Sequence, residues 1–193
     1  MKPLNSFLVL FLSFFLSCSQ KVNHPKPISF LRIDYPEKEY YSIDSLCPYQ
    51  FEIPNYSAWV HKFKNNPPCS KAIIFPDLKA ELLCEYQGLN ENLNEHFESV
   101  RSVVFEHSFK SSAIIERLWK NDSLKVYGIT YEIKGNTACN YAFCLTDSVQ
   151  HFFFGQLLFQ CRPNYDSLSP SIEFIKEDLE KLIESFKWEK SIN

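Results

Sequence analysis

The stretch LKVYGITYEIKGNTACNYAFCLTD (residues 124–147) decides the fold class, because it contains two strand-like runs with a turn between them. β-Branched and aromatic residues dominate the first run and recur in the second at Tyr141, Phe143 and Thr146, and these residue types favour strands. Gly135-Asn136 separates the runs, and both residue types tolerate the positive φ of a tight turn. In the first run the odd-numbered face is expected to pack, through Tyr127, Ile129, Tyr131 and Ile133.

Further strand-like runs flank this hairpin. AIIERLW (113–119) precedes it and HFFFGQLLFQC (151–161) follows it, so a four-stranded antiparallel meander is expected. Upstream, KAIIFP (71–76) and LKAELLCEY (78–86) predict another hairpin. Shorter runs punctuated by proline, within 30–40 and 47–56, predict edge strands.

Two segments change to a helical period. In residues 90–106 apolar side chains recur at spacings of four, three and four, with Asn90 as the expected N-cap; they are Leu93, Phe97, Val100 and Val104. A last helix is expected to have Ser169 as its N-cap and Pro170 at its first position. Its apolar stripe comprises Ile172, Ile175, Leu179, Leu182, Ile183 and Phe186.

The order strands, helix, strands, helix predicts an α+β domain with a mostly antiparallel sheet flanked by helices. No linker rich in glycine or serine divides the chain after its N-terminal segment, so residues 30–193 are expected to form a single domain. The charged residues of the last helix, including the adjacent pair Glu177 and Asp178, are expected on its solvated face and pointing apart.

The N-terminus has the pattern of an export signal. Lys2 supplies positive charge, residues 7–16 are apolar except for Ser13, and Phe15-Leu16-Ser17-Cys18 fits the cleavage site of a lipoprotein signal peptide. Residues 1–17 are therefore expected to be removed, leaving a lipidated Cys18 and a polar tether over residues 18–29. The alternative is ordinary cleavage after residue 19, without lipid.

The net charge bears on the class of partner, and the cysteine content bears on disulfides and metal binding. The chain carries a net charge of −3 and no basic stripe, so nucleic acid is not expected as a partner. Six cysteines besides Cys18 are compatible with disulfides in an exported protein, and the sequence leaves their pairing open; they are Cys47, Cys69, Cys84, Cys139, Cys144 and Cys161. A zinc site formed by Cys139, Cys144, His151 and Cys161 is an alternative use of three of them.

Motifs of catalysis are missing from the sequence. Its four glycines do not form a nucleotide-binding spacing, and neither G-x-S-x-G nor H-E-x-x-H occurs. His96 and His107 would lie about 16 Å apart along one helix, too far to share a metal, and are expected to be structural. We therefore expect no catalytic residues, no metal and no cofactor.

The loops supply the candidate binding residues. Two connections stand out, the turn within YEIKGNTACNYAF and the link CRPNYDSLSP before the last helix. Turn chemistry and helix capping can explain both. The functional interpretation is a protein-binding surface with exposed aromatic side chains, comprising Lys134, Asn136, Tyr141 and Tyr165.

The chain as a whole resembles the GldD family of gliding-motility lipoproteins from the Bacteroidetes. The resemblance rests on Cys18 and then, in order, on FLRIDYPEKEY, CPYQFEIPNY, FPDLKAELLCEY, VYGITYEIKGNTA, FCLTDSVQHFFFGQLLF and PNYDSLSPSIEFIKEDLEKLIESFKW. It implies an envelope lipoprotein that supports gliding and the associated type IX secretion machinery by contacts with other envelope proteins. Only Cys18 is carried over as a functional position, and the implied location is the membrane surface facing the periplasm.

The order of elements also resembles the Mog1/PsbP-like α/β/α sandwich. A small-molecule binding module or a cryptic periplasmic hydrolase remains the alternative function for such a fold.

Overall fold

The computed structural model describes residues 33–43, 46–61, 68–106 and 108–189. The expected signal peptide, the whole tether with Cys18, residues 30–32 of the expected domain and His107 lie outside these residues.

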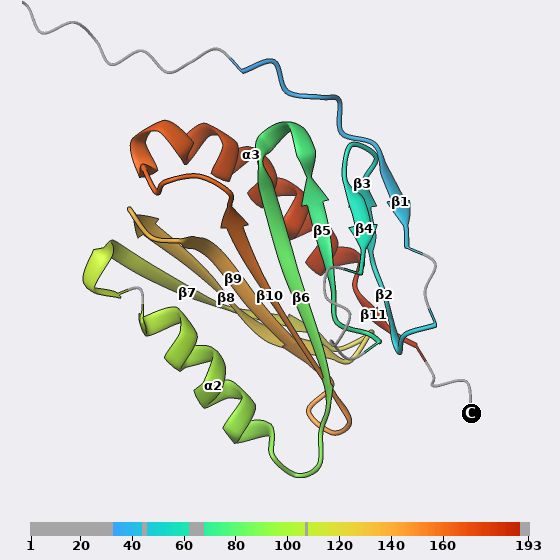
Figure 1. The fold of residues 1–193 in the computed structure, drawn as a ribbon. Coiled ribbons are helices and arrows are strands. Elements are labelled where there is room, and N and C mark those ends of the chain that lie inside the picture. The colour runs from blue at the N-terminus through green and yellow to red at the C-terminus, as the bar shows by residue number, and fades with distance from the viewer. Residues whose placement is uncertain (1–32, 44–45, 62–67, 107, 190–193) are drawn as a thin grey trace, which may run out of the picture. The chain divides into compact units, whose positions relative to one another are not determined.

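A seven-stranded sheet forms the centre of the fold, in the order β4-β5-β6-β10-β9-β8-β7 (Figure 1). Every neighbouring pair is antiparallel. The strands are β4 (Ala58–Val60), β5 (Lys71–Phe75), β6 (Ala80–Gly88), β7 (Ser111–Asn121), β8 (Val126–Gly135), β9 (Cys139–Thr146) and β10 (His151–Phe159). The predicted meander is thus confirmed as β7–β10, and the predicted upstream hairpin as β5–β6, joined by the 3₁₀ helix η2 (Pro76–Leu78).

Two helices cover opposite faces of the sheet, α2 (Leu93–Glu106) and α3 (Tyr165–Ser185) (Figure 1). Between α2 and the sheet, Val100 and Val104 pack in one apolar cluster with Tyr131 and Phe152. A larger cluster on the other face combines the stripe of α3 with the other side of the strands. The α+β class and both predicted helical stripes are therefore confirmed.

The prediction that the odd-numbered face is the one that packs is incomplete for β8, because β8 is buried on both faces. Tyr131 and Ile133 on the predicted odd-numbered face are buried against α2, but Val126 and Glu132 on the even-numbered face are buried too. The sequence pattern showed one packing face because glycine, threonine and glutamate occupy most of the other. Because α3 covers that second face, β8 is enclosed on both sides.

Two small sheets involve the N-terminal part of the domain, and one of them pairs it with the strand that follows α3. β1 (Tyr40–Ser42) pairs with β3 (Glu52–Pro54), and β2 (Tyr49–Gln50) pairs with β11 (Lys187–Trp188). Four buried aromatic rings pack together beneath them, those of Tyr49, Phe51, Phe153 and Phe186.

Both predicted helix starts are wrong. α3 begins at Tyr165, four residues before the predicted N-cap Ser169, and Pro170 lies inside it. Pro170 has no N–H for the carbonyl of Asp166, and the Ser169 hydroxyl donates to that carbonyl instead, at 3.3 Å. In α2 the carbonyl of Asn92, not Asn90, accepts the first helical bonds, from the N–H groups of Glu95 and His96.

Candidate binding surface between α3 and the β7–β8 edge

Charged and aromatic side chains gather where α3 passes over β7 and β8. Cross-strand pairing places Arg117 opposite Thr130, and Tyr141 opposite Glu132. Together with the facing residues of α3 these side chains form what we call the α3–β8 strip. Its members are Arg117, Trp119, Thr130, Glu132, Lys134, Asn136, Tyr141, Tyr165, Lys176, Glu180 and Glu184.

Glu132 is the centre of the charged part of the strip. Its side chain is only 7% exposed, and it accepts hydrogen bonds from Lys176 Nζ at 2.9 Å and Arg117 Nη1 at 3.2 Å. Lys134 Nζ lies 3.5 Å from its other oxygen. Burial alone would raise the pKa of Glu132, but the bonds from Lys176 and Arg117 outweigh it and the pKa is lowered. The carboxylate is thus held ionised among three cations.

A cavity of about 200 Å³ adjoins this ion-pair network. The Trp119 and Tyr141 rings line it together with Arg117, while Glu180 and Glu184 of α3 supply acidic groups. The indole Nε1 of Trp119 is buried and contacts no hydrogen-bond acceptor among the described residues. The cavity therefore combines aromatic surface with two acidic groups and one basic group.

Three of the four predicted binding residues meet at one end of the strip. Asn136 Oδ1 accepts the backbone N–H of Tyr165 at 2.7 Å, which caps the start of α3 from a turn 29 residues away. Gly135 before it has a φ of 124°, as the predicted turn requires. Lys134 is half-exposed and lies near Tyr165, whose pKa is raised first of all by burial.

The exposure expected for Tyr141 is wrong. Tyr141 is 2% exposed, and it lines the cavity instead of projecting into solvent. Every residue of β9 is buried, because the strand is central in the sheet and covered on both faces. Burial raises the pKa of Tyr141 to about 12, so it is a neutral phenol at physiological pH.

A second buried carboxylate, Asp178, was missed by sequence reasoning. It is 1% exposed, and its oxygens accept hydrogen bonds from the hydroxyls of Tyr40, at 2.7 Å, and Tyr56. Lys38 Nζ lies 3.1 Å away. Burial and then Asp178 raise the pKa of both tyrosines. Glu177 is exposed as expected, so only one member of the acid pair is solvated.

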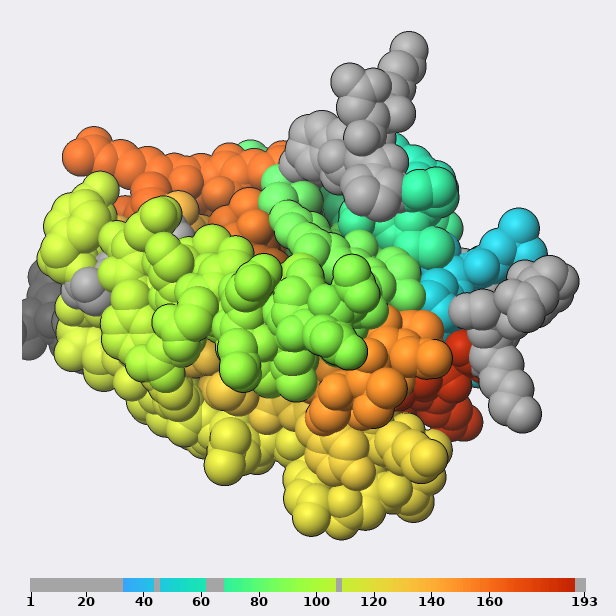
Figure 2. Space-filling view, turned by 90° about the horizontal axis from the view of Figure 1, so that it is seen from below, coloured from blue at the N-terminus to red at the C-terminus, as the bar shows by residue number. Residues whose placement is uncertain are grey.

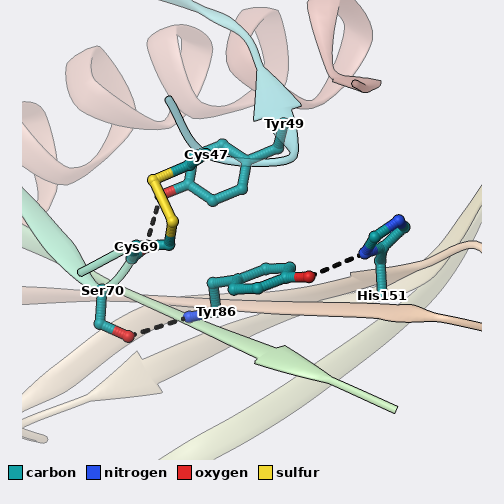
Figure 3. The surroundings of a disulfide bond; sticks show 6 residues. All are labelled: Cys47, Tyr49, Cys69, Ser70, Tyr86 and His151. Carbon is teal, nitrogen blue, oxygen red and sulfur yellow. Dashed lines mark hydrogen bonds between the residues drawn. A yellow bond between two sulfur atoms is a disulfide. The ribbon is translucent and has the colours of Figure 1, made fainter. Parts of the chain in front are cut away.

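The described cysteines form one disulfide, Cys47–Cys69, across 22 residues of sequence (Figure 3). Beside it the Tyr49 hydroxyl donates to the carbonyl of Cys69, and the Tyr86 hydroxyl bonds His151 Nδ1 at 2.8 Å. Cys84, Cys139 and Cys144 are buried free thiols, and Cys161 is an exposed one.

The alternative zinc site is not supported. Cys139 and Cys144 lie in the apolar cluster beneath α2, whereas the His151 ring stacks on Trp188. Among the residues that the structure describes, no three His, Cys, Asp or Glu side chains are arranged to hold a metal ion. His96, expected to be structural, is partly buried and stacks on Phe152 at 5.1 Å between ring centroids.

Comparison with known families decides the identity of the chain. A family model described as gliding motility lipoprotein GldD matches residues 20–188. The chain belongs to this family. The resemblance noted in the sequence is thereby confirmed, and membership of a lipoprotein family places the protein at a membrane of the cell envelope.

Other comparisons add little to this family assignment. No curated protein is significantly similar in sequence. Among solved structures, the chain is similar to a cyanobacterial PsbP protein from Synechocystis, with 13% identity, a TM-score of 0.48, and coverage of 84% of this chain and 98% of that one. Neither helix within the described ranges has the length and apolarity needed to cross a bilayer.

Proposed function

We propose that this protein is anchored by lipid on Cys18 and supports gliding motility, and the associated type IX secretion machinery, through contacts with other envelope proteins. Residues 1–17 are removed as the signal peptide, residues 18–29 are the tether, and residues 30–193 are the domain, which faces the periplasm. The match of the gliding motility family over residues 20–188 is the observation that carries this proposal.

The α3–β8 strip supports action by protein contacts. It combines charged groups with the aromatic residues that dominate binding energy at protein interfaces. Its cavity of about 200 Å³ is smaller than the roughly 300–1,000 Å³ usual for small-molecule sites, and it fits a side chain of a partner better than a metabolite. We therefore assign partner binding to this strip, with Lys134, Asn136 and Tyr165 at one end and Tyr141 beneath it.

The chemistry of the three buried thiols gives no support to a cysteine nucleophile at those positions. Burial raises the pKa of Cys139 and Cys144 to about 12 and that of Cys84 well above its usual value. Thiols in this state are poor nucleophiles. The disulfide Cys47–Cys69 also supports an oxidising compartment, as the periplasm is.

Membrane fractionation of Cys18→Ser tests the anchor. Because the acyl chains, and not the domain, would provide the membrane affinity, the variant is expected to move from the membrane to the soluble fraction with its folded domain intact. Cys161→Ser, which removes an exposed thiol elsewhere, is the control and should stay with the membrane. Membrane retention of Cys18→Ser, with no lipid label on the wild type, would overturn the proposal.

A further inference from the structure

The outer edge of β7 is long and open. β7 is the last strand of the sheet and has eleven residues, whereas β4 at the other edge has three. Among the described residues no strand pairs with this outer edge. Leu118 near its middle is 87% exposed. An open strand of this length can pair with another chain, and natural proteins usually shorten or cover such edges.

We propose that the β7 edge pairs with β7 of a second copy of this chain, in an antiparallel register centred on Leu118. In a symmetric antiparallel pair, residues equidistant from the centre face each other on the same side of the sheet. Centring on Leu118 places Glu116 opposite Lys120 of the second copy, and Arg117 opposite Trp119 of the second copy. Both pairs occur twice because of the symmetry.

Other registers lack this complementarity. Centring on Glu116 or Arg117 puts like charges directly opposite, which is destabilising. Centring on Ile115 or Trp119 leaves Glu116 and Lys120 without an opposite charge across the interface. The charges of β7 are thus self-complementary in one register, and this feature of the sequence identifies a second copy as the occupant.

The charged side chains that would pair across the two strands, Lys120 and Arg117, are exposed enough in the structure to contact a second copy. Lys120 lies 3.1 Å from Asp122, but both side chains are about two-thirds exposed, so this ion pair is weak and can be exchanged. Arg117 is more than half exposed while it bonds Glu132. Its counterpart from the second copy would meet the Trp119 ring in the cavity that Glu180 and Glu184 also line. The ring and both carboxylates favour a cation there, while the chain's own Arg117 is held by Glu132.

Anchoring makes a small interface sufficient. The register pairs seven residues of each strand, which buries less surface than stable dimers in solution usually need. Proteins held on one membrane have a raised effective concentration, so a weak contact can still be populated there. The inference therefore uses the proposed membrane anchor, but not the proposed role in motility.

Cysteine crosslinking of the full chain in its own membranes tests the register. In a Cys161→Ser background, Leu118→Cys places two thiols about 5 Å apart at the Cβ atoms, whereas Glu116→Cys places them about 14 Å apart. Mild oxidation should give disulfide-linked dimers for Leu118→Cys and none above background for Glu116→Cys. Dimers from Glu116→Cys instead, or adducts of Leu118→Cys only with another protein, would overturn the second-copy proposal.

Exchanging the charges of Glu116 and Lys120 is a second test of the register. Recovery of the crosslink in the double variant would show that the single variants lose it through charge and not through misfolding. In the Leu118→Cys background, Glu116→Lys or Lys120→Glu alone puts like charges opposite and should abolish most of the crosslink. The double variant Glu116→Lys/Lys120→Glu restores opposite charges and should recover it. Failure of the double variant to recover the crosslink would contradict the register, whereas release of the protein from the membrane would show that the anchor itself has failed.

Discussion

Two buried carboxylates, Glu132 and Asp178, show how single residues hold the α3 side of the domain together. Each is ionisable and nearly inaccessible to water, and each is satisfied by partners distant in sequence. Glu132 joins β7, β8 and α3, and Asp178 joins α3 to Tyr40 and Tyr56 of the N-terminal part. Removing such a carboxylate lowers the free energy of unfolding, because its hydrogen-bond donors are left buried and unpaired.

Asp178→Ala is expected to reduce the free energy of unfolding by about 3 kcal/mol, because two tyrosine hydroxyls and Lys38 lose their common acceptor. Its neighbour Glu177 is exposed and bonds Lys38 at 2.9 Å, so Glu177→Ala should cost less than about 1 kcal/mol. Urea unfolding of both variants measures the difference. Equal costs would contradict the burial of Asp178.

Glu132→Gln is expected to show a pH-dependent loss of stability. The pKa of Glu132 is below its usual value of 4.5 in the folded protein, so ionised Glu132 contributes stability above that value, and the contribution is lost as the pH falls through the folded pKa. The advantage of the wild type should therefore be full near about pH 7 and shrink below about pH 4.5.

Urea unfolding across this pH range checks the sign. Glu173→Gln, which replaces an exposed carboxylate of α3 that lies 3.6 Å from Lys176, is the control and should differ less from the wild type at about pH 7. A wild-type advantage over Glu132→Gln that grows on acidification would contradict the ionised state assigned to Glu132.

At the scale of elements, α3 depends on a cap that lies outside its own sequence. The residue before the helix, Asn164, makes no side-chain capping bond, whereas Asn136 in the β8–β9 turn accepts the N–H of Tyr165. The turn that was predicted as a binding loop is therefore also a support for the helix. This arrangement positions α3 over β8 and so shapes one end of the α3–β8 strip.

Asn136→Ala should cost about 1 kcal/mol, the usual effect of losing a helix cap, while Asn164→Ala should cost less than about 0.5 kcal/mol. Thermal unfolding of the two variants, which make the same change of side chain, compares them directly. A larger loss for Asn164→Ala would show that α3 is capped from within its own segment.

Local periodicity explains what the sequence could predict. The meander and the apolar stripes of α2 and α3 follow from the spacing of neighbouring residues, so they were found correctly. The partners of Asp178 lie more than a hundred residues away, and no local pattern reports such a contact. The burial of Tyr141 had a signal, since NYAFCL is an almost unbroken apolar run, which is typical of a strand covered on both faces.

At the scale of the whole molecule, the two covered faces of the sheet present different surfaces. α2 exposes an outer side that carries Glu95 and Glu98, and the green residues of this helix are visible at the surface in Figure 2. On the other face, α3 borders the strip with its ion pairs and cavity. If the protein acts by contact, the two faces should differ in their sensitivity to a reversal of charge.

Complementation of a deletion strain measures this difference most directly. Glu180→Lys/Glu184→Lys reverses two exposed carboxylates at the cavity, and Glu95→Lys/Glu98→Lys makes the same change of charge on α2. With both proteins at wild-type abundance and thermal stability, the α2 variant is expected to restore gliding and the α3 variant to fail. Full gliding with the α3 variant, or loss of gliding with the α2 variant alone, would contradict the assignment of partner binding to the α3–β8 strip.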